Sequence, residues 1–121
     1  MNNETQEIER GDWAAFADDF TKQHAGATAT LEAVGSDVGD QYAAENLPFV
    51  GMTLESKGSD VGALTLMLGT ESADHLERLV AAPKSLRVHV SPNGETVLQI
   101  QADDEPTLLL HLQPHPALSA P

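Results

Sequence analysis

The stretch from residue 11 to residue 26 constrains the fold most strongly, because its apolar side chains repeat with the period of an α-helix. The side chains at positions i, i+3, i+4, i+7 and i+11 share one helical face; they are Trp13, Phe16, Ala17, Phe20 and His24. Asp12 is a suitable N-cap, and Gly26 is a suitable end because glycine reaches the left-handed cap conformation at low cost. Three of the five aromatic residues lie on this face. We therefore expect an N-terminal helix that supplies the bulk of the core.

After Gly26 the apolar period changes from that of a helix to 2, which is typical of β-strands. Turns divide this part of the chain, and the clearest one is Ser91-Pro-Asn-Gly94. Asn46-Leu47-Pro48 ends one strand, because proline cannot donate to a strand ladder. The segment 75–81 fits a strand or a short helix, and its alternation favours a strand. Strands are expected at about residues 27–33, 40–45, 49–57, 63–69, 75–81, 85–90, 96–100 and 107–112.

These elements predict an α+β fold, in which one N-terminal helix packs on a strongly curved antiparallel sheet or small β-barrel of seven to eight strands. The helix would cover the open side of the sheet or plug one end. The segments 63–69 and 107–112 are apolar on both faces, so they would be central in the sheet or covered on both sides. A length of 121 residues suits a single domain over residues 1–121, with loose tails at 1–7 and 114–121.

Acidic residues dominate the charge of the chain, with 19 acidic and 6 basic residues and a net charge of −13. Nucleic acid and membranes are therefore not expected as partners, because binding them needs clustered lysine and arginine. Two interpretations of the acidity remain. One is a basic protein partner or bound cations, and the other is a halophilic, salt-adapted surface. The chain has no cysteine, and its first residues lack the apolar run of a secretory signal, which fits a cytoplasmic protein.

A short internal repeat links two of the predicted turns. Residues 30–39 and 53–62 match at eight of ten positions, each as the end of a strand plus its turn. The simpler interpretation is that two hairpins use the same turn. In an up-and-down meander, however, alternate loops lie at one end of the sheet, and this would gather an acidic rim that binds cations weakly through oxygen. The residues of this rim are Asp37, Asp40, Asp60, Asp103, Asp104 and Glu105.

The five histidines form no recognisable metal or catalytic pattern. His111 and His115 are four residues apart, which is a metal-binding spacing on a helix, but the flanking prolines exclude a helix there. His24 is either a polar edge of the core or a favourable cation at the helix C-terminus, and His89 faces away from its apolar neighbours. The chain also has no nucleophile elbow and no phosphate-binding loop. We therefore expect no catalytic residue, no cofactor and no metal ligand.

Several short motifs together carry a resemblance to a known family. They are Arg10-x-x-Trp13-x-x-Phe16, Phe20-Thr21 with His24, a Thr-Leu-Glu strand, Leu47-Pro48 with Gly51, Leu68-Gly69 with Asp74-His75, and Ala82-Pro83. With these motifs, residues 7–112 resemble a small bacterial family, the domain of unknown function 5335. The resemblance implies no catalytic residue, cofactor or substrate. It singles out Asp74 and His75 as a candidate polar site, because packing does not readily explain a loop dipeptide within the pattern.

Two functions from different classes fit these features. The first is a non-enzymatic cytoplasmic module that binds a protein partner or forms a homodimer. The acidic composition, the doubly apolar strands and the lack of a catalytic pattern favour it. The alternative is a small-ligand-binding protein or an enzyme with a pocket between helix and sheet, near His75. A pocket of roughly several hundred Å³ with converging polar groups would favour this alternative.

Overall fold

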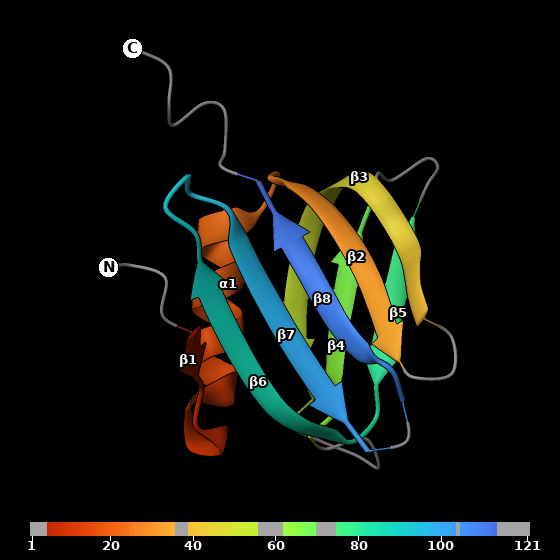
Figure 1. Ribbon diagram of the computed structural model, residues 1–121. Coiled ribbons are helices and arrows are strands. Elements are labelled where there is room, and N and C mark those ends of the chain that lie inside the picture. Colours follow the sequence, from red (N-terminus) through yellow and green to blue (C-terminus); the bar gives the residue numbers. More distant parts are fainter. Residues whose placement is uncertain (1–4, 36–38, 56–61, 70–74, 104, 114–121) are drawn as a thin grey trace.

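One α-helix followed by seven strands makes up most of the structure, and a short strand precedes the helix (Figure 1). The computed structural model describes residues 5–35, 39–55, 62–69, 75–103 and 105–113. The elements in chain order are β1 (Thr5–Glu7), the 3₁₀ turn η1 (Arg10–Asp12), α1 (Trp13–His24), β2 (Thr28–Gly35), β3 (Gly39–Leu54), β4 (Leu64–Leu68), β5 (Leu76–Val80), β6 (Pro83–Val90), β7 (Thr96–Ala102) and β8 (Thr107–Leu112). The predicted α+β class is confirmed, because the change of apolar period at Gly26 marks the change from helix to strand.

All eight strands belong to one antiparallel sheet with the order β1-β6-β7-β8-β2-β3-β4-β5. Strands that follow one another in the chain are neighbours from β2 to β5 and from β6 to β8, and β8 returns to pair with β2. This is the order of an up-and-down barrel opened between β5 and β6. The strongly curved sheet is therefore confirmed, and among the described strands the barrel does not close.

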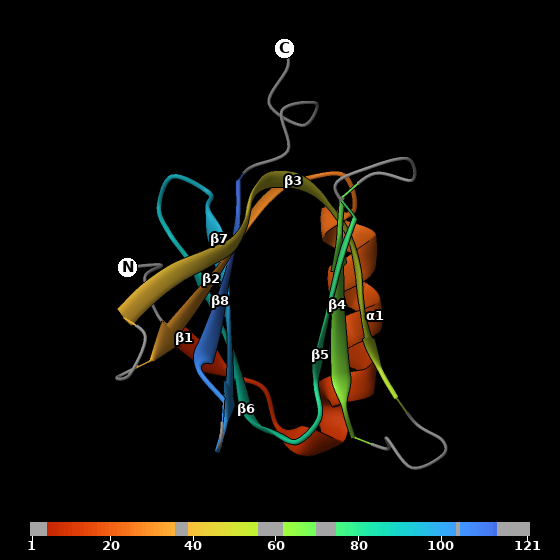
Figure 2. The ribbon, with the colours of Figure 1, turned by 90° about the vertical axis from the view of Figure 1, so that its right-hand side faces the viewer.

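The long strand β3 bends and divides the sheet into two layers (Figure 2). Its first part pairs with β2, and its second part, from Phe49 to Leu54, pairs with β4. We call β1, β6, β7, β8, β2 and the first part of β3 the front layer; the second part of β3, β4 and β5 form the back layer. At the bend, Asn46 has a φ of 57°, in the left-handed region. The predicted strand end at Asn46-Leu47-Pro48 is wrong, because proline removes only one donor and the Pro48 carbonyl still accepts from Gly69 N–H at 2.8 Å.

The core lies between the two layers and consists mainly of strand residues. The largest fully buried side chains are Trp13 from the helix and, from the strands, Leu31, Phe49, Met52, Leu64, Leu66, Leu68, Leu86, Leu98, Ile100, Leu108 and Leu110. The expectation that the helix supplies the bulk of the core is therefore wrong, because alternate residues of both layers point inward. β8 is central in the sheet, as predicted, whereas β4 lies next to the edge strand β5. The outward residues of both strands are only half-buried, so neither strand is covered on both sides.

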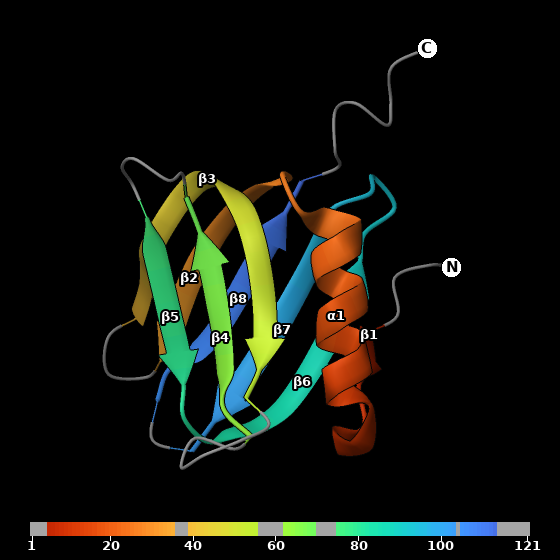
Figure 3. The same ribbon diagram turned by 180° about the vertical axis from the view of Figure 1, so that it is seen from behind.

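Helix α1 takes the place of a strand beside the second part of β3 (Figure 3). Its Thr21 hydroxyl accepts a hydrogen bond from Met52 N–H at 2.9 Å and donates one to the Met52 carbonyl at 3.1 Å. The approach is close, since a Cβ added to Gly51 would lie 3.2 Å from Thr21 Cγ2. A side chain thus satisfies backbone groups that an edge strand would leave exposed. The helix also lies behind β6 and β7, where it covers the open side of the front layer as predicted (Figure 1).

The two ends of the helix differ in how well they match the prediction. Gly26 follows the helix with a φ of 90°, as its role at the end of the helix requires. Asp12 occupies the N-cap position, but its side chain makes no capping hydrogen bond. The chain enters the helix through η1, where the Arg10 guanidinium lies 4.3 Å from the centre of the Trp13 ring. Before η1, β1 pairs with β6, so these residues form a strand where a loose tail was expected.

Candidate functional site

The outer face of the front layer presents rows of polar and titratable side chains that lie side by side across the strands. One row, read from the strand registers, runs through His89, Val97, His111 and Thr30. The neighbouring row runs through Arg87, Gln99, Leu109, Glu32 and Tyr42. Helix α1 lies on the opposite face of this layer (Figure 1). The described helix therefore leaves the outer face of the front layer uncovered.

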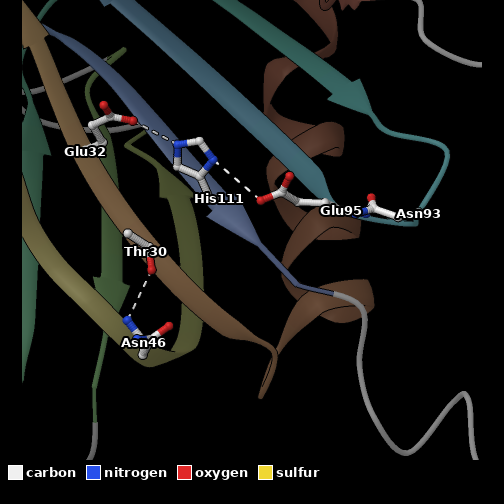
Figure 4. A network of polar contacts seen from close by, with 6 residues as sticks. All are labelled: Thr30, Glu32, Asn46, Asn93, Glu95 and His111. Atoms are coloured by element: carbon white, nitrogen blue, oxygen red, sulfur yellow. Dashed lines mark hydrogen bonds and ion pairs between the residues drawn. The ribbon is translucent and has the colours of Figure 1, made fainter. Parts of the chain in front are cut away.

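His111 is the centre of a polar cluster on this face (Figure 4). It projects from β8 between Glu32 on β2 and Glu95, which directly precedes β7. The Nε2 atom of His111 lies 3.0 Å from Glu32 Oε1, within hydrogen-bond distance, and its Nδ1 atom lies 3.7 Å from Glu95 Oε2. The Glu32 residue is only 8% exposed, which is unusual for a carboxylate and is explained by this hydrogen bond.

The geometry of the cluster limits the chemistry that it can perform. The two carboxylates bind opposite nitrogens of the imidazole, so they do not converge on one point as metal ligands would. Within the described residues, no group of three or more His, Cys, Asp or Glu side chains has a metal-binding arrangement. A general base needs a ring nitrogen that reaches the substrate. In His111, both ring nitrogens face a protein carboxylate instead.

A pocket of about 230 Å³ opens beside His111 on the outer face. The residues that line it are Thr30, Glu32, Tyr42, Glu95, His111 and Gln113. Tyr42 is 57% exposed, although it is large and aromatic, and it lies directly opposite Glu32 in the register of β2 and β3. The pocket therefore combines a nearly buried carboxylate, a second carboxylate and an accessible aromatic ring.

A second pocket of about 370 Å³ lies between β1, β6 and β7 on the same face. Its two cationic side chains are both engaged, because Lys84 pairs with Asp103 at 3.3 Å and Arg87 pairs with Glu7 at 3.5 Å. Its charges are thus balanced locally, which makes it less suited to capture a charged ligand. Neither pocket lies between helix and sheet, where the sequence-based alternative placed a ligand.

Of the site predicted from the sequence, Asp74 with His75, the described residue His75 lines neither of these two pockets. Asp74 lies outside the described residues, and His75 is an exposed residue directly before β5 in the back layer. The structure therefore does not bring His75 together with the His111 cluster. Of the predicted acidic rim, Asp37, Asp60, Asp104 and the side chain of Asp40 also lie outside the described residues. Cation binding at this rim stays a prediction.

The helical aromatic face forms part of the core rather than a ligand site. Trp13 and Phe20 are buried, and Phe16 is half-buried against them. The His24 ring packs on Phe20 with ring centres 4.5 Å apart, and burial lowers the pKa of His24 below its ordinary value of 6.5. Of its two predicted roles, the structure thus favours the polar edge of the core. His89 faces outward, as predicted, with its Nδ1 3.3 Å from the Thr5 hydroxyl.

Sequence reasoning missed the His111 cluster because its members lie far apart in the chain. The spacing of the histidines relates His111 only to His115, whereas the contact of His111 is with Glu32, 79 residues away. One signal was present. His111 breaks an otherwise apolar strand, and Glu32 lies between apolar residues of β2. The pairing of β2 with β8, which brings the two together, could not be read from either segment alone.

Comparisons with known proteins identify a family but no characterised relative. The model of the family DUF5335, described as a family of unknown function, matches residues 4–121 of the chain. The match agrees with the resemblance inferred from the short motifs. No curated protein and no solved structure matches the chain significantly. Among the described elements, no helix has both the length and the apolar character needed to cross a membrane.

Proposed function

The chain belongs to this family of unknown function, and from the geometry of its outer face we propose that it is a non-catalytic, cytoplasmic module that binds a basic protein partner. The single observation that carries the proposal is the uncovered outer face of the front layer, with its acidic pocket around His111. Half-buried apolar side chains such as Val97 and Leu109 lie on this face among polar ones. Such a mixture is typical of the surfaces that bind protein partners reversibly.

Charge favours a basic partner over a second copy of the chain. The net charge is −13, so two copies repel each other, whereas a cationic protein is attracted and its association is accelerated. Three of the six basic residues already pair with acidic neighbours: Lys22 with Asp18, Lys84 with Asp103 and Arg87 with Glu7. The remaining carboxylates give the surface its negative potential. A salt-adapted surface is a second explanation of the same charge, and the partner experiment separates the two.

A non-catalytic role is supported by the arrangement of the His111 cluster. Each ring nitrogen of His111 faces a carboxylate of the protein itself, at 3.0 Å and 3.7 Å, so neither is directed toward a substrate. The neighbouring pocket is also smaller than the roughly 300–1,000 Å³ typical of sites for whole small molecules.

The proposal is tested by capturing partners on the immobilised protein from a lysate of the source cells. The test variant is Val97→Arg, which places a positive charge at the centre of the outer face. The matched control is Leu79→Arg, because Leu79 is 49% exposed and points outward from β5 in the back layer. We expect the protein and the control, but not Val97→Arg, to capture proteins that are predominantly basic. Equal capture by all three, or a captured set without basic character, would contradict the proposal and leave salt adaptation as the explanation.

A further inference from the structure

The pocket beside His111 contains a carboxylate whose charge the cluster itself does not fully satisfy. The shorter contact of His111 is the one with Glu32, at 3.0 Å. The contact of His111 with Glu95 is 3.7 Å, beyond the usual range of a hydrogen bond. The Glu95 side chain is 36% exposed and lines the pocket, so it presents its charge to the solvent-filled space. The pocket therefore favours a donor with a positive charge.

The wall of the pocket indicates which cation fits best. Tyr42 is 57% exposed and lies across the strands from Glu32, so its ring is accessible from the pocket. Guanidinium groups stack on aromatic rings and bind carboxylates through two parallel N–H groups, while they are less strongly hydrated than an ammonium group. Thr30 and Gln113 add a hydroxyl and an amide to the lining, both of which offer acceptor oxygens. These features together favour guanidinium over ammonium.

The size of the pocket indicates where the guanidinium comes from. At about 230 Å³, the pocket is below the range of sites that enclose an entire ligand, and it opens on a broad sheet surface. A single long side chain that projects from a larger partner satisfies both conditions. We propose that this pocket receives the guanidinium of an arginine side chain, held by Glu95 and stacked on Tyr42. This inference rests on the proposed function in one respect, namely that the arginine belongs to the basic protein partner.

The experiment follows the backbone amide signals of the ¹⁵N-labelled protein during titration with Nα-acetyl-arginine amide. Nα-acetyl-citrulline amide is the matched ligand, because it has nearly the same shape without the charge, and Nα-acetyl-lysine amide tests the preference for guanidinium. A short, otherwise neutral peptide with one arginine distinguishes a free amino acid from a peptide as the source. We expect saturable shifts at the pocket residues with a dissociation constant on the order of 1 mM for arginine. The peptide should bind at least as tightly, lysine several-fold more weakly and citrulline not at all.

Two surface variants and one control keep the test independent of folding. Glu95→Gln and Tyr42→Leu each change an accessible residue of the pocket, and we expect each to weaken arginine binding about tenfold. Glu77→Gln is the matched control, because it removes the same charge from an exposed position on β5, and it should change binding less than twofold. Shifts spread over the whole acidic surface, equal weakening by Glu77→Gln, or equal binding of citrulline or lysine would overturn the inference. So would the absence of saturable binding.

The two proposals fail in different ways. If arginine does not bind but Val97→Arg still abolishes the capture of basic proteins, the pocket assignment is wrong and the proposed function stands. If arginine binds in the pocket but Val97→Arg captures partners as well as the unaltered protein, the pocket assignment stands and the proposed docking face is wrong.

Discussion

The hydroxyl of Thr21 replaces a neighbouring strand at the edge of β3, so removing this hydroxyl should destabilise the protein. Thr21 Oγ1 accepts from Met52 N–H at 2.9 Å and donates to the Met52 carbonyl at 3.1 Å. Met52 is only 2% exposed, so its backbone groups cannot turn to water unless the helix moves. Valine has nearly the shape of threonine but neither a donor nor an acceptor. Thr21→Val therefore removes both hydrogen bonds with little change in packing.

The size of the effect follows from the two groups left without partners. A buried donor or acceptor that loses its hydrogen bond costs about 1–3 kcal/mol. Because the site is only partly buried, we expect Thr21→Val to lower the free energy of unfolding by about 2–4 kcal/mol in total. For a domain of this size, about 4 °C of melting temperature corresponds to each kcal/mol, so Tm should fall by about 8–16 °C.

Urea denaturation followed by the fluorescence of Trp13, the single tryptophan, measures this change. Thr21→Ser is the matched control, because it keeps the hydroxyl and loses only a methyl group, at a cost of about 1 kcal/mol. If valine is tolerated to within about 0.5 kcal/mol, the range of ordinary surface substitutions, the hydroxyl does not hold the helix on the strand. The reasoning also fails if serine is as damaging as valine.

Two further predictions concern the bend of β3 and the edge of the core. Asn46 has a φ of 57°, so Asn46→Ala should destabilise the fold by about 1–2 kcal/mol, whereas Asn46→Gly should be nearly neutral. Thermal melting compares the two variants, and equal changes in stability would contradict a conformational cause. Burial lowers the pKa of His24 in the folded protein. As the pH falls toward 6.5, the unfolded chain therefore binds a proton at His24 more readily than the folded protein does. The contribution of His24 to stability is therefore complete above the unfolded pKa and declines as the pH falls through it. Relative to His24→Gln, the protein should lose stability between about pH 8 and pH 5.5 in urea titrations, and a pH-independent difference would contradict this.

The local features of the fold could be predicted because each has a local cause. The apolar period of residues 11–26 fixes the helix, and Gly26 ends it with a positive φ. Alternation and turn residues locate most of the strands. The bend of β3 was predicted as a break, because Pro48 signals a missing donor and cannot show that the chain continues on the other side. Strand β1 was missed because its three exposed residues carry no apolar alternation.

The candidate site depends on pairing between distant segments, and the sequence contains little information about it. Glu32 and His111 meet only because β8 returns to β2, and Glu95 joins them because β7 runs on the other side of β8. A strand's apolar pattern defines which face is buried, but many partners satisfy the same pattern. The sequence motifs single out Asp74 with His75 because of their position in a predicted loop. For the His111 cluster, the local signal is a polar residue within each of two apolar strands, and it does not indicate that these residues meet.

The pairing of β2 with β8 has a consequence for how the protein is made. β2 is the first strand after the helix, and its neighbour on one side is β8, the last of the described strands along the chain. Ala29 can therefore pair with Leu112 only after that residue has been synthesised. During synthesis on the ribosome, this edge of β2 has no partner until residues 107–112 emerge. The front layer is thus completed only once residues 107–112 have been synthesised. Such long-range pairing slows folding to roughly milliseconds or longer, and in this interval chaperones can bind the unpaired strand.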